Sequence, residues 1–189
     1  MTVHSALATD WKATLKPALQ KEMHVKSPMQ VPEVTKVVVN VGIGSYLQKL
    51  GTKDYSFVVE NLRAITGQQP VVRTARKSVS NFKLRQGMPV GVYVTLRGER
   101  AYAFLEKMVH VVFPRVRDFR GIGRKSFDKA GNYSVAFTDH TVFPEGVLPE
   151  DARRTFGLQV TVCTTAKTPA EGEMLLEKLG FPFKKKPTV

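Results

Sequence analysis

Residues 34–43 read Val-Thr-Lys-Val-Val-Val-Asn-Val-Gly-Ile, a run dominated by β-branched side chains. Such side chains favour extended backbone, so the run predicts a strand that ends at its glycine. A second stretch, Gly91–Arg97, alternates strictly between two kinds of residue. Because successive side chains of a strand point to opposite faces, its valines and leucine share one face and its polar residues share the other. The polar face of this predicted strand carries Tyr93, Thr95 and Arg97.

Helical and extended patterns alternate along the rest of the chain. Apolar spacing predicts helices over 2–23, 52–66, 99–112 and 168–179, and short β-branched runs predict strands over 71–75, 132–138 and 158–165. Pro17 predicts a kink or a break in the first helix, and Pro114 lies just beyond the predicted end of the third. Strands that follow one another closely favour a mostly antiparallel sheet. The prediction is an α+β fold in a single domain, residues 1–189, with helices packed on one face of the sheet and the other face open.

The charge of the chain points to a polyanionic partner. The 189 residues include 29 Lys+Arg against 16 Asp+Glu, for a formal net charge of +13. Residues 73–129 contain 14 of these basic residues and only 4 of the acidic ones. Such a surplus attracts nucleic acid by releasing its counterions. An anionic membrane is the weaker alternative, because the basic region has no amphipathic helix of its own, no run is long enough to span a bilayer, and no secretory signal is evident.

A basic loop over residues 73–87 carries the sharpest signal. It contains five cations and no anion, mixed with Ser78, Ser80, Asn81 and Phe82. Cations and hydroxyls bind phosphates and sugars, and an aromatic ring stacks on bases. We favour nucleic-acid contact over a solvated loop with Phe82 buried, because cations this dense repel one another without an anion. A second basic segment, Arg115–Lys129, also contains Asp118 and Asp128, which we expect to neutralise neighbouring arginines.

The residues of catalysis and metal binding are not grouped in this sequence. The four histidines are scattered, and the single cysteine, Cys163, excludes a disulfide framework and a multi-cysteine zinc site. The glycines at 42 and 44 lack the third glycine of a dinucleotide-binding loop. We therefore predict no catalytic residues, no metal, no cofactor and no small-molecule substrate. Two alternatives stay open: a general nucleic-acid chaperone or DNA-coating protein, and an enzyme.

Nine motifs resemble one family of proteins. They are Met29-Gln-Val-Pro32, Lys36-Val-Val-Val-Asn-Val-Gly-Ile-Gly44, Ile65-Thr-Gly-Gln-Gln-Pro-Val71, Phe82-Lys-Leu-Arg-Gln-Gly-Met-Pro-Val-Gly91, Val94-Thr-Leu-Arg-Gly98, Phe113-Pro-Arg-Val-Arg-Asp-Phe-Arg-Gly121, Gly131-Asn-Tyr-Ser134, Phe143-Pro-Glu145 and Thr164-Thr-Ala-Lys167. Over residues 29–183 the chain resembles the bacterial form of the 5S rRNA-binding ribosomal protein family, universal large-subunit protein five. Residues 127–131 and 146–156 depart from the family pattern.

The resemblance implies partners and site residues. The partners are 5S rRNA, 23S rRNA, the P-site tRNA, a protein of the small-subunit head and other large-subunit proteins, in the central protuberance of the cytoplasmic ribosome. Carried over by motif, with the charged and aromatic residues near them on the same strands, the 5S rRNA site comprises Asn40, Gln68, Thr95, Tyr93, Arg97 and Lys36. The tRNA-contacting loop comprises Arg73, Arg76, Lys77, Ser78, Phe82, Lys83 and Arg85. Residues 115–131 are the candidate surface for the intersubunit bridge.

Overall fold

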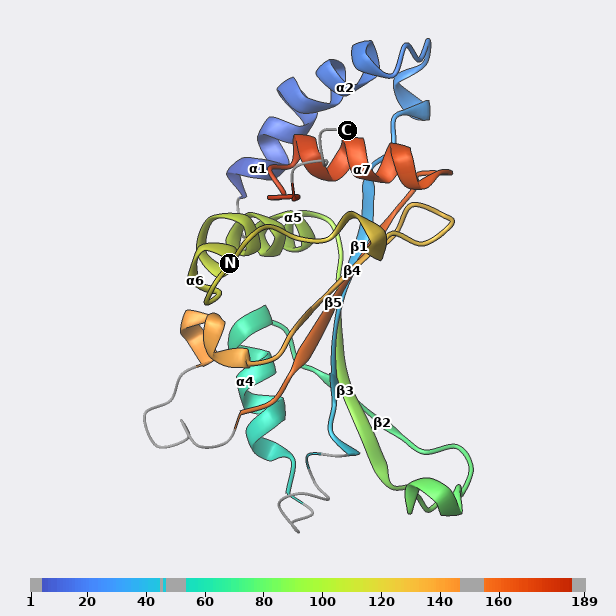
Figure 1. Ribbon diagram of the computed structural model, residues 1–189, viewed down its shortest axis with the longest axis vertical. Helices are drawn as coiled ribbons and strands as arrows, with labels where there is room; N and C mark the ends of the chain where they lie inside the picture. The colour runs from blue at the N-terminus through green and yellow to red at the C-terminus, as the bar shows by residue number, and fades with distance from the viewer. Residues whose placement is uncertain (1–4, 45, 47–53, 147–154, 185–189) are drawn as a thin grey trace. The chain divides into compact units, whose positions relative to one another are not determined.

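The structure is an open five-stranded antiparallel sheet with helices, so the predicted α+β class is confirmed. A computed structural model describes residues 5–44, 46, 54–146 and 155–184. The sheet has the strand order β2-β3-β1-β5-β4 (Figure 1). The strands span Val34–Gly42 (β1), Val71–Thr74 (β2), Pro89–Leu96 (β3), Tyr133–Phe137 (β4) and Leu158–Thr164 (β5).

The chain divides into two compact units. The first unit comprises residues 1–37, 96–135 and 161–189, and the second comprises residues 38–95 and 136–160. Four of the strands, all except β2, contribute residues to both units. The single domain predicted from the sequence stays a prediction.

The second unit contains helix α4 (Ser56–Thr66). The helix buries Phe57, Val58, Leu62 and Ile65, and the strands of the unit bury Val39, Val41, Val92 and Val94. The predicted start at residue 52 lies outside the described residues, and the helix begins at Ser56, whose backbone N–H donates to Asp54 Oδ1 at 2.9 Å. Gly67 ends it as predicted, because its φ of 65° is a left-handed conformation that glycine adopts without a steric penalty.

Two prolines are accommodated inside helices of the first unit. The N-terminal helical segment runs through α1 (Ala6–Asp10), a π-helical turn (Trp11–Leu15) and α2 (Lys16–Glu22). The next runs through α5 (Glu99–Lys107), a π-helical turn (Met108–Val112) and α6 (Phe113–Arg115).

Pro17 therefore does not break its helix, which was one of the two outcomes predicted for it, and Pro114 lies within a helix and not beyond one as predicted. In both segments the residue before the proline donates its N–H five residues back, from Lys16 to Trp11 and from Phe113 to Met108. We attribute the accommodation to the wider turn, which relieves the clash between a proline ring and the carbonyl four residues earlier.

The first unit ends with α7 (Pro169–Lys178). Thr168 caps this helix by accepting the Glu171 N–H, and Glu171 Oε2 accepts the backbone N–H of Lys167 at 2.8 Å. Short 3₁₀ turns occupy Pro28–Gln30, Ser80–Phe82, Arg124–Ser126, His140–Val142 and Pro144–Gly146. The core of the unit includes Trp11, Leu19, Phe104, Leu105, Met108, Phe113, Leu175 and Leu176.

Candidate nucleic-acid interface

In the second unit, one face of the strands carries accessible polar side chains. Asn40 of β1 is exposed, and Tyr93 and Thr95 of β3 are partly accessible. Their sequence neighbours Val39, Val41, Val92 and Val94 are buried. This alternation places Asn40, Tyr93 and Thr95 away from the apolar core of the unit, as their spacing predicted.

Gln68 reaches β3 from the turn that follows α4. Its side-chain Nε2 donates to the Thr95 carbonyl at 3.2 Å, and its backbone N–H donates to Thr66 Oγ1. The structure therefore brings together two residues that the resemblance assigned to one site. The Gln68 amide group also has a structural task, because it ties the turn to the end of β3.

Arg73 and Tyr93 form a second contact between neighbouring strands. The hairpin register pairs Val71 with Tyr93 and Arg73 with Gly91. The Arg73 guanidinium donates to Tyr93 Oη at 2.7 Å, and its Cζ lies 5.0 Å from the Tyr93 ring centroid. Arg73 thus lies on β2 beside a strand residue, although the sequence grouped it with the loop.

The other two residues expected at the 5S rRNA site belong to the first unit. Lys36 is partly accessible in β1. Arg97 is exposed, and it lies just beyond β3, which ends at Leu96 and not at Arg97 as predicted.

The basic loop joins β2 to β3 and folds back on itself. Val79 and Leu84 pair through two backbone hydrogen bonds of 3.0 and 3.1 Å, and Ser78 Oγ accepts the Gln86 N–H at 3.0 Å. Lys83 adopts a left-handed φ of 52°, which closes the 3₁₀ turn between the paired residues. The loop is therefore a hairpin extension held by its own backbone hydrogen bonds.

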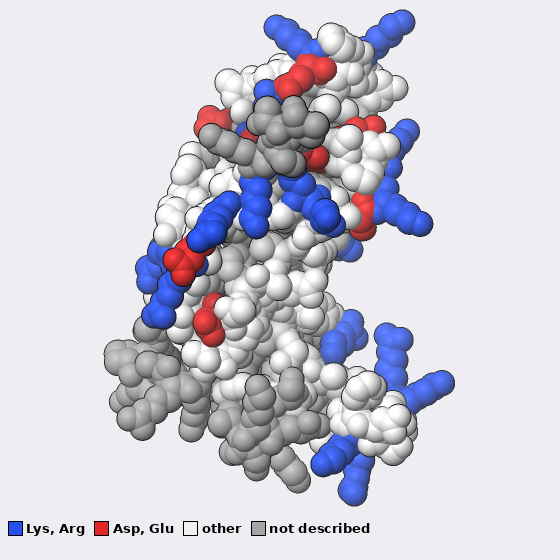
Figure 2. All heavy atoms as spheres, in the orientation of Figure 1, with Lys and Arg blue, Asp and Glu red and all other residues white. Residues whose placement is uncertain are grey.

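The side chains of this loop that were expected to contact tRNA face solvent. Phe82 is 69% exposed, so the alternative in which it is buried in the core was wrong. Figure 2 shows Lys and Arg atoms around the loop with no Asp or Glu among them on the face drawn. Exposure is shared by all the residues expected to contact tRNA, which are Arg73, Arg76, Lys77, Ser78, Phe82, Lys83 and Arg85.

In the second basic segment, Arg115–Lys129, one arginine forms ion pairs and a hydrogen bond within the first unit. Arg124 pairs with Glu173 and, at 2.7 Å, with Glu177 of α7, and its Nε donates to the Lys184 carbonyl at 2.9 Å. Nothing in the local sequence around Arg124 indicated these partners, which lie 49 to 60 residues away.

The role expected for Asp128 was wrong. Its carboxylate accepts hydrogen bonds from the backbone N–H of Ala130 and from the backbone and side chain of Asn132, at 2.7 to 3.0 Å. The Asn132 side chain, then the backbone N–H groups, lower the pKa of Asp128. Asp128 therefore organises a turn, and within the described part of the chain it forms no ion pair with an arginine.

The structure adds one residue that sequence reasoning missed at this surface, Gly91. A Cβ built on it would lie 3.4 Å from the Val41 carbonyl oxygen and 3.8 Å from Asn40 Oδ1. The position therefore lies beside the Asn40 amide and carries no side chain. A glycine inside a strand pattern was the available signal, since it often marks a close approach of a ligand or another backbone.

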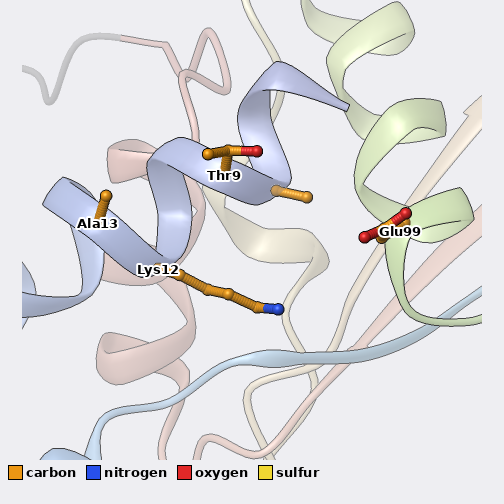
Figure 3. Close-up of a pocket in the computed structure, with 5 residues that line it drawn as sticks. Thr9, Lys12, Ala13 and Glu99 are labelled. Atoms are coloured by element: carbon orange, nitrogen blue, oxygen red, sulfur yellow. The ribbon is translucent and has the colours of Figure 1, made fainter. Parts of the chain in front are cut away.

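A shallow hollow of about 420 Å³ in the first unit offers no comparable chemistry (Figure 3). It is lined by Ala8, Thr9, Lys12, Ala13 and Glu99. Lys12 is the one cation and Glu99 the one anion of this lining, and neither a histidine nor a cysteine belongs to it. Among the residues that the structure describes, no three metal-ligating side chains gather together, and no helix is long and apolar enough to cross a membrane.

Comparisons with known proteins agree on one family. Residues 27–85 match the family described as ribosomal protein L5, and residues 89–183 match the model that describes the C-terminus of the same ribosomal family. A protein of Natranaerobius thermophilus is 49% identical over 94% of this chain and 97% of its own. One of Thermotoga maritima is 47% identical over 95% and 96%, and one of Saccharopolyspora erythraea 46% over 94% of each. All three are named large ribosomal subunit protein uL5.

Proposed function

The chain belongs to the ribosomal protein L5 family, and from that premise we propose that it anchors 5S rRNA in the central protuberance of the large ribosomal subunit. It is a structural constituent of that subunit, and its family is not one of enzymes. Its place is the ribosome, among rRNA and other ribosomal proteins.

The observation that carries the proposal is the accessible polar strand face of the second unit. Asn40 presents an exposed amide there, and Thr95 and Tyr93 present partly accessible hydroxyls. Amide and hydroxyl groups hydrogen-bond sugar 2′-hydroxyls and base edges, which is how proteins recognise folded RNA. We also assign Lys36, Arg97 and Gln68 to 5S rRNA binding, and Gln68 positions the end of β3 as well.

The loop between β2 and β3 has a separate task in this proposal. Its exposed cations and the exposed ring of Phe82 are suited to a tRNA backbone and an unstacked base. We assign it to the P-site tRNA. The exposed cations of residues 115–131 are assigned to a protein of the small-subunit head in the intersubunit bridge, and 23S rRNA is a further partner.

A competition assay tests the first part. Labelled 5S rRNA bound to the purified protein is challenged with unlabelled 5S rRNA, another structured RNA of equal length, and duplex DNA. We expect only 5S rRNA to compete efficiently. Equal competition by all three would contradict the proposal and support the general chaperone or DNA-coating alternative.

A pair of variants tests the division between face and loop. Asn40→Ala combined with Thr95→Ala should weaken 5S rRNA binding. Replacing Arg76, Lys77 and Lys83 by alanine should leave that binding nearly intact and weaken P-site tRNA binding by ribosomes that carry the variant. An equal loss of 5S rRNA binding in both variants would show that the division is wrong.

A further inference from the structure

Arg73 is placed with the strand face and not with the tip of the loop. It lies on β2, it pairs in register with Gly91, and its guanidinium is bound to the Tyr93 hydroxyl at 2.7 Å. Tyr93 shares its side of β3 with Thr95, because the two are separated by two positions. The positive charge of Arg73 is therefore held at the edge of the face that carries Asn40.

The residue that pairs with Arg73 across the hairpin is Gly91, which carries no side chain. Gly91 lies on β3, between Arg73 on β2 and Asn40 on β1 in the strand order. A Cβ on Gly91 would meet its nearest neighbours at 3.4 and 3.8 Å, which are ordinary contact distances. An alanine would therefore fit, yet this position between Arg73 on β2 and Asn40 on β1 carries no side chain.

We propose that Arg73, held in place by Tyr93, binds a phosphate of the RNA where its backbone crosses the strand face at Gly91. This inference rests on the proposed 5S rRNA function and moves Arg73 from the tRNA loop to the rRNA site. The contact with Tyr93 restricts the guanidinium before the RNA arrives, so less side-chain entropy is lost on binding. The remaining N–H groups of the guanidinium suit phosphate oxygens, and the glycine admits the RNA backbone closely.

Three variants with matched controls test this assignment against 5S rRNA. Arg73→Ala should weaken binding about ten-fold and reduce the log–log salt slope by about 0.7–0.9, the value for one lost phosphate contact. Arg76→Ala removes the same charge from the exposed loop and should change affinity by less than about two-fold. Tyr93→Phe should weaken binding less than Arg73→Ala, because it frees the guanidinium but keeps the charge.

Gly91→Ala probes the position without a side chain directly. We expect it to weaken 5S rRNA binding without lowering the melting temperature, while Gly123→Ala, at an open position in the first unit, should leave 5S rRNA binding unchanged. If Arg73→Ala and Arg76→Ala weaken binding equally, or if Gly91→Ala binds like the wild type, the inference is overturned. Failure of the wild-type protein to select 5S rRNA would instead overturn the proposed function.

Discussion

At the scale of single residues, Gln68 shows how one side chain combines two tasks. Its sequence motif predicted that it binds RNA, and the structure shows that its Nε2 donates a hydrogen bond to the Thr95 carbonyl. A hydrogen bond of this kind contributes about 0.5–1.5 kcal/mol to stability. The amide therefore holds the end of β3, beside the Thr95 hydroxyl that the proposed site uses.

Gln68→Ala should lower the free energy of unfolding by about 1 kcal/mol, because it removes the only hydrogen bond that this side chain makes to a described residue. Gln68→Glu should cost at least as much, since a carboxylate cannot donate to a carbonyl. Urea unfolding measures both. Gln69→Ala, at the exposed neighbouring position, is the control and should stay within about 0.5 kcal/mol of the wild type.

Tyr133 predicts a loss of stability at high pH. Burial raises its pKa from 10.0 to about 12, and its hydroxyl donates to the Gly123 carbonyl at 2.9 Å. Because folding raises this pKa, the stabilisation is complete below pH 10 and is lost as the pH rises through about 12. Burial, and then Glu33, raise the pKa of Tyr102 to about 12 as well.

The measurement compares wild type with Tyr133→Phe by urea unfolding between about pH 9 and pH 12. The variant should be less stable at the lower pH, because it lacks the hydrogen bond to Gly123. The gap should narrow as the pH rises, because only the wild type loses stability by ionising Tyr133 on unfolding. A difference in the free energy of unfolding that stays constant over this pH range would contradict the raised pKa of Tyr133.

At the scale of elements, the close approach of α7 to the turn at residue 131 decides which residues are tolerated. A Cβ on Gly172 would lie 2.3 Å from the Gly131 carbonyl oxygen, and one on Gly131 would lie 2.7 Å from Ala166 Cβ. Gly131 also adopts a left-handed φ of 75°. The two glycines therefore let the helix and the turn pack backbone against backbone.

Gly172→Ala should destabilise the protein by about 2–3 kcal/mol, although alanine is the better helix former in isolation. The reason is that a backbone carbonyl occupies the space of the new methyl group. Thermal or urea unfolding measures the effect. Met174→Ala, at an exposed position on the same helix, should change stability by less than about 0.5 kcal/mol, and an equal loss in the two variants would refute the packing argument.

At the scale of the whole molecule, the uneven distribution of charge governs affinity for RNA. The net charge is +13, and residues 73–129 hold 14 of the 29 basic residues with only 4 of the 16 acidic ones. In the structure two glutamates of α7 pair with Arg124 and offset its charge, whereas the loop cations are exposed. Most of the attraction to RNA should therefore come from exposed cations and depend on salt.

The affinity for 5S rRNA should fall with salt concentration along a log–log slope of about −4 to −5, as expected for about six phosphate contacts. Filter binding across a range of potassium chloride concentrations measures it. The double variant Asn40→Ala with Thr95→Ala should lower the affinity and keep the slope, because it removes no charge. A flat response of the wild type would contradict the electrostatic contribution.

Local sequence patterns alone determined most of the secondary structure and two exposed features, the polar strand face and the basic loop. The β-branched run at 34–43 and the alternation at 91–97 predicted β1 and β3, and the cations at 73–87 predicted an exposed basic loop. These predictions succeed because strand periodicity, glycine stops and charge repulsion act between residues close in sequence. The family motifs then narrowed the expected partner from polyanions in general to ribosomal RNA.

Only the tertiary structure decided which residues that are far apart in the sequence contact one another. Three contacts join residues that lie 20 to 53 positions apart. They are the hydrogen bond from the Gln68 side chain to the Thr95 carbonyl, the hydrogen bond from Arg73 to the Tyr93 hydroxyl, and the ion pairs of Arg124 with Glu173 and Glu177. The π-helical turns that precede Pro17 and Pro114 were not predicted from the sequence either. Such pairings follow from register and packing, which local residue preferences do not encode.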